Sequence, residues 1–188
     1  MDNREILLHV ALSLFSHRGY DAVGVQEVVE TAGVTKPTLY YYFDSKRGLL
    51  DALIKREEGR LLTRIMNASI YRGDLVYTLE RIVGAYFKFV IEHPAFYRFQ
   101  IAMVFAPPES DSNKAIQPFI NQQIEILEEI FIQAAADHGN VRGRHKRYAV
   151  GLLSIINAMV GLFLNGELGL TEEIVHQAVH QFMHGIFS

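Results

Sequence analysis

Apolar residues in the N-terminal third of the chain recur every three or four positions, which is the period of one face of an α-helix. The first helix is expected to end at Gly19, because glycine readily adopts the backbone conformation that terminates a helix. Its apolar positions are Ile6, Leu7, Val10, Ala11, Leu14 and Phe15. A shorter repeat predicts a second helix between Gly24, which can serve as its N-cap, and Gly33, which stops it.

Helix signals continue through the rest of the chain. Thr35 is expected to N-cap a third helix whose first turn tolerates Pro37, and Ser45 is expected to cap a fourth. Further helices are predicted at about 74–92, 94–105, 115–137, 146–165 and 172–187, with loops at Asp74, Pro94, PPESDSN, HGNVRG and NGELG. Because no alternating strand pattern with hairpin turns occurs, the sequence predicts an all-α fold of about nine helices.

The sequence VTKPTLYYYF places three consecutive tyrosines on the third helix. Each residue turns a helix by about 100°, so three neighbouring side chains cannot all be buried on one side. Leu39 and Phe43 are four residues apart and are expected to share the inward face, which directs Tyr41 outward and Tyr40 and Tyr42 to the flanks. A short helix, a glycine turn and a threonine cap precede this helix. Together they outline a helix-turn-helix, whose second helix lies in the major groove of DNA.

The longer run GYDAVGVQEVVETAGVTKPTLYYYFDSKRGLLDAL resembles the DNA-binding domain of the TetR family of transcriptional repressors. The resemblance covers about the first third of the chain and agrees at many positions in register. The matching residues are Gly19-Tyr20, Ala32-Gly33-Val34-Thr35-Lys36, Leu39-Tyr40, Tyr42-Phe43 and Ser45-Lys46.

The resemblance implies a three-helix DNA-binding domain over residues 1–47 and an effector-binding and dimerisation bundle over 48–188. The fourth helix, from about residue 46, would link the two. It also implies a homodimer that binds palindromic operator DNA, as a repressor, and releases it when a small molecule binds the C-terminal domain. The competing interpretation is a helical ligand-binding or adaptor protein that has lost specific DNA binding.

The DNA contacts that the resemblance implies lie around the third helix. Thr35 would cap the helix and donate to phosphate, while Lys36 and Lys46 would supply charge near the DNA backbone. Exposed apolar side chains on such a helix can reach base edges, and the flanking tyrosines would send hydroxyls to phosphate. An alternative is that the tyrosines only pack the small domain. The full set is Gly24, Thr35, Lys36, Pro37, Thr38, Tyr40, Tyr41, Tyr42 and Lys46.

Two departures from the family pattern concern phosphate binding. The family often has threonine where this chain has Val23 and Gly24, so only the backbone amide of Gly24 could replace that hydroxyl. After Ser45 and Lys46 the family often has glutamate, where this chain has Arg47 followed by glycine.

Charge and composition narrow the function without defining it. Residues 1–60 hold eight Lys or Arg and nine Asp or Glu, and the whole chain has a net charge of −3. Bulk electrostatics therefore does not indicate nucleic-acid binding, and non-specific DNA affinity is expected to be modest. The absence of cysteine excludes disulfides and Cys-ligated zinc. Since no P-loop, GxGxxG, GxSxG or HExxH motif occurs, we expect neither an enzyme nor a cofactor.

Aromatic side chains crowd the middle of the chain. Most are expected to be core, but a bundle this rich in rings could also enclose an apolar cavity with a few polar groups. The interpretation as a pocket predicts an apolar or aromatic small-molecule effector. Its candidate contacts are Tyr86, Phe89, His93, Phe96, Tyr97, Phe99 and Met103.

Residues 148–164 carry no charge and follow the basic sequence RGRHKR. The run is at the short limit for crossing a membrane and is interrupted by Ser154 and Asn157, so we favour a buried helix of a soluble protein. Small residues three and four apart predict a dimer interface, with a cavity-lining stripe as the alternative. The predicted interface comprises Gly151, Ser154, Ala158, Gly161 and Asn165, with Val175, Val179, Phe182 and Ile186 of the last helix. Because the N-terminus lacks signal-peptide features, a cytoplasmic protein with no membrane partner is expected.

His176, His180 and His184 form a stripe along the last helix, each four residues after the last. Histidines at this spacing can bind zinc or nickel, but no Cys or carboxylate of this helix completes a site. We therefore predict no metal. The other interpretation is a polar border of the dimer interface, which would gain positive charge as the pH falls towards 5.

Overall fold

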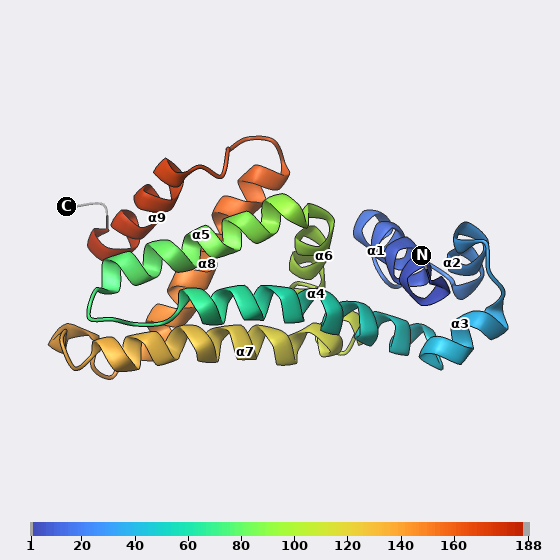
Figure 1. Cartoon of the computed structure of the whole chain (residues 1–188), viewed down its shortest axis with the longest axis horizontal. Helices are drawn as coiled ribbons and strands as arrows, with labels where there is room; N and C mark the ends of the chain where they lie inside the picture. The colour runs from blue at the N-terminus through green and yellow to red at the C-terminus, as the bar shows by residue number, and fades with distance from the viewer. Residues whose placement is uncertain (1, 186–188) are drawn as a thin grey trace. The chain divides into compact units, whose positions relative to one another are not determined.

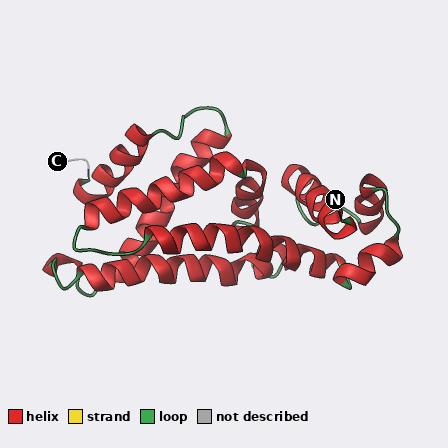
Figure 2. Cartoon of the chain, in the orientation of Figure 1, coloured by secondary structure: helices red, strands yellow, loops and turns green. Residues whose placement is uncertain are grey.

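The computed structural model describes residues 2–185, which form helices joined by loops (Figures 1 and 2). Within that range there are nine α-helices, one short 3₁₀ helix and no strand, which confirms the predicted all-α fold. The elements are α1 (Asn3–Arg18), α2 (Val25–Ala32), α3 (Lys36–Phe43), α4 (Lys46–Ala68), α5 (Leu75–Glu92), α6 (Pro94–Val104), α7 (Asp111–Ala134), η1 (Gly139–Val141), α8 (His145–Leu164) and α9 (Glu172–His184).

The largest error in the predicted elements concerns α7, which begins at Asp111 instead of near residue 115. The preceding serine caps it: the hydroxyl of Ser110 accepts the backbone N–H of Asn113 at 3.2 Å. The Asn113 side chain in turn donates to the carbonyl oxygens of Met103 and Val104, at 3.2 and 3.0 Å. Part of the segment expected to be a loop is therefore the first turn of a helix. At the other end of the chain, Gly185 caps α9, and residues 186–187 of that predicted helix lie outside the described range.

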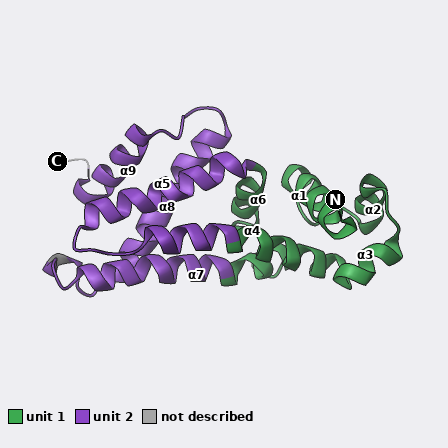
Figure 3. Ribbon diagram, in the orientation of Figure 1, with its two compact units in different colours: residues 1–59, 95–118 green, residues 60–94, 119–188 purple. Residues whose placement is uncertain are grey.

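Two compact units divide the chain, residues 1–59 with 95–118 and residues 60–94 with 119–188 (Figure 3). We call them unit 1 and unit 2. Both α4 and α7 contribute residues to each unit. A division by function after residue 47 stays a prediction.

The core of unit 1 follows from the apolar faces of its first three helices. Leu7, Leu8, Ala11 and Phe15 of α1, Val28 and Val29 of α2, and Leu39 and Phe43 of α3 are buried. The Phe15 ring meets Tyr20 edge-on at a centroid distance of 5.3 Å and Phe99 at 5.8 Å. Such aromatic packing fixes the small domain beneath its exposed third helix.

Unit 2 is built around α5, one side of which is almost continuously buried. This side includes Tyr86, whose hydroxyl donates to the side-chain oxygen of Gln123 at 2.9 Å inside the unit. A buried hydroxyl is stable there because it has this partner. On the surface, α9 packs against α5 and α8 (Figure 1).

Helix α8 corrects the expectation of a buried helix. Only 28% of its most apolar stretch is buried within the chain. Leu152, Ile156 and Val160 face inward, whereas Val150 and Leu162 are about two-fifths exposed, at 42% and 41%. The helix is long and apolar enough to cross a membrane, but core helices of soluble proteins can have the same length and composition. It thus presents a long apolar surface that its own chain leaves open.

Candidate nucleic-acid interface

The turn between α2 and α3 is set by a glycine in the left-handed conformation. Gly33 ends α2 with φ 65° and ψ 31°, and its N–H donates to the carbonyl of Glu30. Thr35 then caps α3, because its hydroxyl accepts the N–H of Thr38 at 3.4 Å, while the two threonine hydroxyls lie 2.9 Å apart. The chain therefore turns sharply and starts a new helix within three residues, as a helix-turn-helix requires.

Helix α3 presents its tyrosines in the directions expected from its period. Leu39 and Phe43 are 0% and 5% exposed, whereas Tyr41 is 82% and Tyr40 is 43% exposed. Tyr42 is half-buried, and its ring meets that of Tyr41 edge-on at 5.1 Å. Such a well-exposed aromatic side chain, held on a short capped helix, is available to a ligand outside the protein.

The start of α3 is suited to an anion. Lys36 and Pro37 are exposed, and the first turn contains no acidic residue. The first N–H groups of a helix have no intrahelical acceptor and carry a partial positive charge. Phosphate oxygens can therefore approach this end of the helix without meeting a carboxylate on it.

Two of the predicted phosphate contacts are engaged within the chain. The Tyr42 hydroxyl donates to Asp2 at 3.3 Å. Burial, and to a smaller extent the charge of Asp2, raises the pKa of this phenol. The ammonium of Lys46 lies 4.1 Å from the centre of the Tyr20 ring, and burial lowers its pKa despite the nearby Asp21 and Asp111. Either side chain must leave its present partner to reach a phosphate.

Arg47 and Gly48, where the chain departs from the family pattern, have a structural explanation. Arg47 donates to Asp51 at 2.8 Å and to Asp111 at 3.3 Å, so it ties the start of α4 to the start of α7 in unit 1. A Cβ atom at Gly48 would lie 2.0 Å from the backbone oxygen of Phe43, a distance that real Cβ atoms do not occupy. Glycine is therefore required where α4 passes the last residue of α3.

Gly24, the other departure, caps α2 with its backbone in the extended region and without a side-chain hydrogen bond. It is exposed, and a Cβ atom there would meet nothing within 4 Å. A threonine would fit sterically at this position, so glycine is not required by packing. The role of its amide in phosphate binding stays a prediction.

The predicted effector contacts belong to two units. Tyr86, Phe89 and His93 are in unit 2, where His93 stacks on Phe89 with ring centroids 4.7 Å apart. The other four are in unit 1 and buried in α6. Of these, Phe99 and Met103 line a cavity of about 250 Å³ together with the last residue of α1 and residues 19–22 of the turn that follows it. Six of the seven are no more than 2% exposed, the exception being His93.

Sequence reasoning missed polar groups inside the core. The side-chain oxygen of Gln100 is buried and has no hydrogen-bond partner in the described part of the chain. Tyr97, one turn earlier on α6, is fully buried, and burial together with the carboxylate of Glu58 raises its pKa. The only available signal was a glutamine and a glutamate at inward positions of their helices.

The predicted dimer surface is partly exposed. Ser154 and Ala158 of α8 and its C-cap Asn165 are exposed, and Gly161 is half-buried. On α9, however, Val179 is only 1% exposed, so it offers no surface to a second subunit. Val179 and two other residues of the predicted set pack within unit 2 instead. Val175 is half-buried and lines a polar groove beside α5.

Those two residues are Phe182 and Gly151. The Phe182 ring lies 6.0 Å from Phe131 and 6.2 Å from Tyr148, and a Cβ atom at Gly151 would contact it at 3.5 Å. The small residue at 151 therefore makes room for α9 of the same chain. Ile186 lies outside the described residues.

The three histidines of α9 are exposed, and the carboxylate that meets His176 comes from another helix. His176 Nδ1 lies 2.8 Å from the Glu80 carboxylate of α5, and the rings of His180 and His184 are 4.7 Å apart. Within residues 2–185, no group of three His, Cys, Asp or Glu side chains is placed to hold a metal ion.

A capped helix-turn-helix with an exposed aromatic face defines this protein as a DNA-binding regulator of the helix-turn-helix class. The sequence profile described as "Bacterial regulatory proteins, tetR family" matches residues 7–53, the segment that forms this site. Residues 7–53 thus form a DNA-binding domain of the TetR family, which occurs in DNA-binding transcriptional regulators that are not enzymes.

Individual relatives extend the comparison. The HTH-type transcriptional activator FasR of Mycolicibacterium smegmatis is 28% identical over 189 residues, which cover 98% of this chain and 82% of FasR. IcaR of Staphylococcus aureus, a negative transcriptional regulator of a biofilm operon, is 31% identical over 77 residues, 39% of this chain and 41% of IcaR. The crystal structure of FadR from Bacillus subtilis with stearoyl-CoA is similar in fold, with a TM-score of 0.80, 16% identity, and 97% and 98% of the two chains covered.

Proposed function

We propose that this TetR-family regulator binds palindromic operator DNA as a homodimer, with α3 of each subunit in the major groove. The observation that carries the proposal is the 82% exposed ring of Tyr41 on a capped helix whose opposite face is buried. Pro37, Thr38 and Tyr41 would read base edges, while Thr35 and Lys36 would bind phosphate.

The homodimer is proposed from α8. Its exposed Val150, Leu162 and Ala158 form a surface too apolar to remain in water without cost. A two-fold interface uses the same surface on both subunits, and small side chains such as Ser154 and Ala158 let two such helices approach closely. In a productive dimer the two copies of α3 would lie about one DNA turn apart, roughly 34–36 Å or somewhat more.

The proposed effector is an apolar small molecule that releases the operator. Stearoyl-CoA in the FadR structure makes long acyl chains the first class to test. The unpaired oxygen of buried Gln100 supports a ligand-responsive core, because a buried acceptor normally has a donor. Since the candidate aromatics are tightly buried, such a ligand would have to displace them and would favour a state with differently spaced recognition helices.

The sign of regulation is proposed to be repression, because an operator-bound dimer blocks a promoter without further contacts. FasR, which matches nearly the whole chain, is named an activator, whereas IcaR is named a negative regulator. In vitro transcription from a promoter that carries the operator distinguishes the two signs. Transcripts that rise when the protein is added would establish activation.

The proposal as a whole is tested by selecting bound sequences from a random DNA library. A palindromic consensus, bound by dimers and released by a long-chain acyl compound, is the expected result. The competing adaptor function predicts no enriched sequence. An enriched sequence without two-fold symmetry would contradict the homodimeric arrangement.

A further inference from the structure

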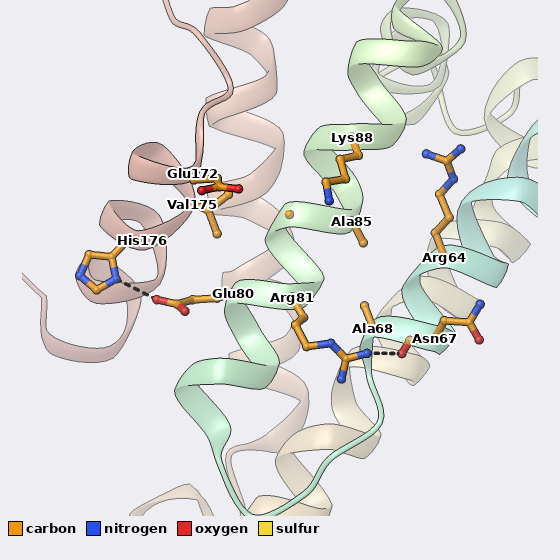
Figure 4. A pocket seen from close by; sticks show the side chains of 11 residues that line it. Arg64, Asn67, Ala68, Glu80, Arg81, Ala85, Lys88, Glu172, Val175 and His176 are labelled. Atoms are coloured by element: carbon orange, nitrogen blue, oxygen red, sulfur yellow. Dashed lines mark hydrogen bonds and ion pairs between the residues drawn. The ribbon is translucent and has the colours of Figure 1, made fainter.

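Unit 2 contains a groove on the outer side of α5, away from the apolar core of the bundle. The groove has a volume of about 680 Å³, within the range of roughly 300–1,000 Å³ that is typical of small-molecule sites. The C-terminal part of α4 forms one wall and α9 the other, with α5 between them (Figure 4). Ala68, Gly84 and Ala85 line it with little side-chain bulk, and a Cβ atom at Gly84 would meet nothing within 4 Å.

The two faces of α5 are chemically different. Ile82, Val83 and Tyr86 on one face are buried in unit 2. Arg81 and Lys88 lie on the other face and reach into the groove, as Figure 4 shows. A ligand in the groove would therefore be separated from the apolar interior by the helix itself.

Cationic side chains gather on the α4 and α5 side of the groove. The Arg64 guanidinium is paired with Glu92 at 2.5 Å, and Arg81 donates to the backbone oxygen of Asn67 at 2.7 Å. The ammonium of Lys88 is exposed and has no hydrogen-bond or ion-pair partner in the described part of the chain. Three cations lining one groove are notable in a chain whose net charge is −3.

The α9 side supplies acceptors instead. The carboxylate of Glu80 is held by His176 at 2.8 Å, while that of Glu172 has no partner among the described residues. A bare inorganic anion would be repelled by Glu172. A ligand that also carries hydroxyl or amino donors would satisfy that carboxylate.

We propose that this groove is a second ligand site, which binds a phosphate-bearing ligand of the nucleotide class. Its phosphates would lie against Arg81, Lys88 and Arg64, and its sugar or base donors would face Glu172. Arg81 and Lys88 are seven residues apart, or about 10 Å along the helix, so they would engage separate parts of one elongated molecule. Arginine and lysine both suit phosphate, the first through paired donors and the second as a point charge.

The phosphate could belong to a free nucleotide or to the nucleotide head of an acyl thioester. The acyl thioester rests on the proposed function, because its acyl chain would be the proposed effector. The first form is independent of it.

Isothermal titration of the full-length chain at low salt tests the site, with ADP, pyrophosphate and inorganic phosphate as ligands. We expect ADP to bind more tightly than pyrophosphate, and pyrophosphate more tightly than phosphate. Arg81→Gln and Lys88→Gln should each weaken ADP binding about tenfold, since each removes a charge-assisted contact. Lys146→Gln, which removes an exposed cation of α8 outside the groove, should leave the affinity unchanged.

A long-chain acyl-CoA and the matching free fatty acid distinguish the two sources. If the groove binds a nucleotide head, the two glutamine variants should weaken acyl-CoA binding about tenfold and leave fatty-acid binding unchanged. If neither ADP nor acyl-CoA responds to the two variants while melting curves show them folded, the groove is only a polar surface.

The two proposals fail separately. Operator release by a fatty acid combined with silent variants would overturn the groove site alone. ADP binding that the variants weaken, without operator release by any acyl compound, would overturn the proposed effector alone.

Discussion

The contact between Gly48 and the end of α3 leads to a sharp prediction about how the recognition helix is held. A Cβ atom at position 48 would lie 2.0 Å from the backbone oxygen of Phe43 and 3.1 Å from its carbonyl carbon. Backbone atoms cannot rotate away as a flexible side chain can. Gly48→Ala must therefore displace either α4 or the last residue of α3.

The magnitude follows from a comparison with Gly59 of the same helix, where a Cβ atom would meet nothing within 4 Å. Replacing a helical glycine by alanine stabilises a helix by about 1 kcal/mol, and this gain applies to both variants. The difference in unfolding free energy between the two variants therefore equals the cost of the clash at position 48. Overpacked sites in protein cores typically cost about 1–3 kcal/mol. For a chain of this size the difference corresponds to roughly 2–12 °C in melting temperature.

Thermal unfolding followed by circular dichroism measures the two variants beside the parent. We expect Gly59→Ala to melt at or above the parent temperature and Gly48→Ala at or below it. Operator affinity should fall in Gly48→Ala alone, because Phe43 is the last residue of the recognition helix. Equal melting temperatures for the two variants would refute the close contact as the reason for glycine at position 48.

Three further predictions concern strain, association and pH. Asp44 adopts φ 59°, a backbone conformation that favours glycine. Asp44→Gly should therefore raise the unfolding free energy by about 1 kcal/mol in a denaturant titration. An unfolding free energy below that of the parent would show that the Asp44 side chain is needed. Ala158→Trp should yield monomers that bind a half-site but not the palindrome, and sedimentation of an intact dimer would exclude α8 as the interface. Burial, and to a smaller extent the charge of Asp111, raises the pKa of Tyr20 to about 12. The contribution of Tyr20 to stability should therefore be complete below pH 10 and lost as the pH rises through 12. Tyr20→Phe should therefore reduce the fall in melting temperature between pH 10 and 12. Part of the fall should remain because of Tyr71, since burial and Asp137 also raise the pKa of Tyr71 to about 12. An unchanged fall would contradict the role of Tyr20.

Local patterns predicted the helices and the direction of Tyr41, because both depend on the helical period and on stops such as Gly33. Position 110 shows how a local signal can be overlooked. Ser110 is an ordinary N-cap, but the two prolines before it made the whole segment look like a loop. The sequence held that signal.

Contacts between distant residues could not be predicted in this way. The Tyr42 hydroxyl meets Asp2 across 40 residues of sequence, and Arg47 meets Asp111 across 64. These contacts depend on which helices pack together, which the period of each helix alone does not determine. For the same reason the groove beside α5, whose lining comes from three helices, was not foreseen.

Part of the predicted dimer surface packs within its own chain, because the surface was inferred from each helix seen alone. Small residues on α8 serve two purposes: Gly151 accommodates Phe182 of the same chain, whereas Ala158 is exposed. A stripe of small residues signals close helix packing. It does not say whether the neighbouring helix belongs to the same subunit.

The most direct test of the account is the operator affinity of Tyr41 variants, measured by fluorescence anisotropy on the selected consensus and on single-base variants of it. Because Tyr41 is 82% exposed, Tyr41→Ala should leave the melting temperature close to that of the parent. We expect it to weaken operator binding by about 1–3 kcal/mol and to reduce discrimination at particular base pairs. Lys36→Gln should instead weaken all sequences alike and reduce the salt slope by about one. A Tyr41→Ala protein that binds the operator as tightly and as selectively as the parent would contradict the assignment of α3 as the recognition helix.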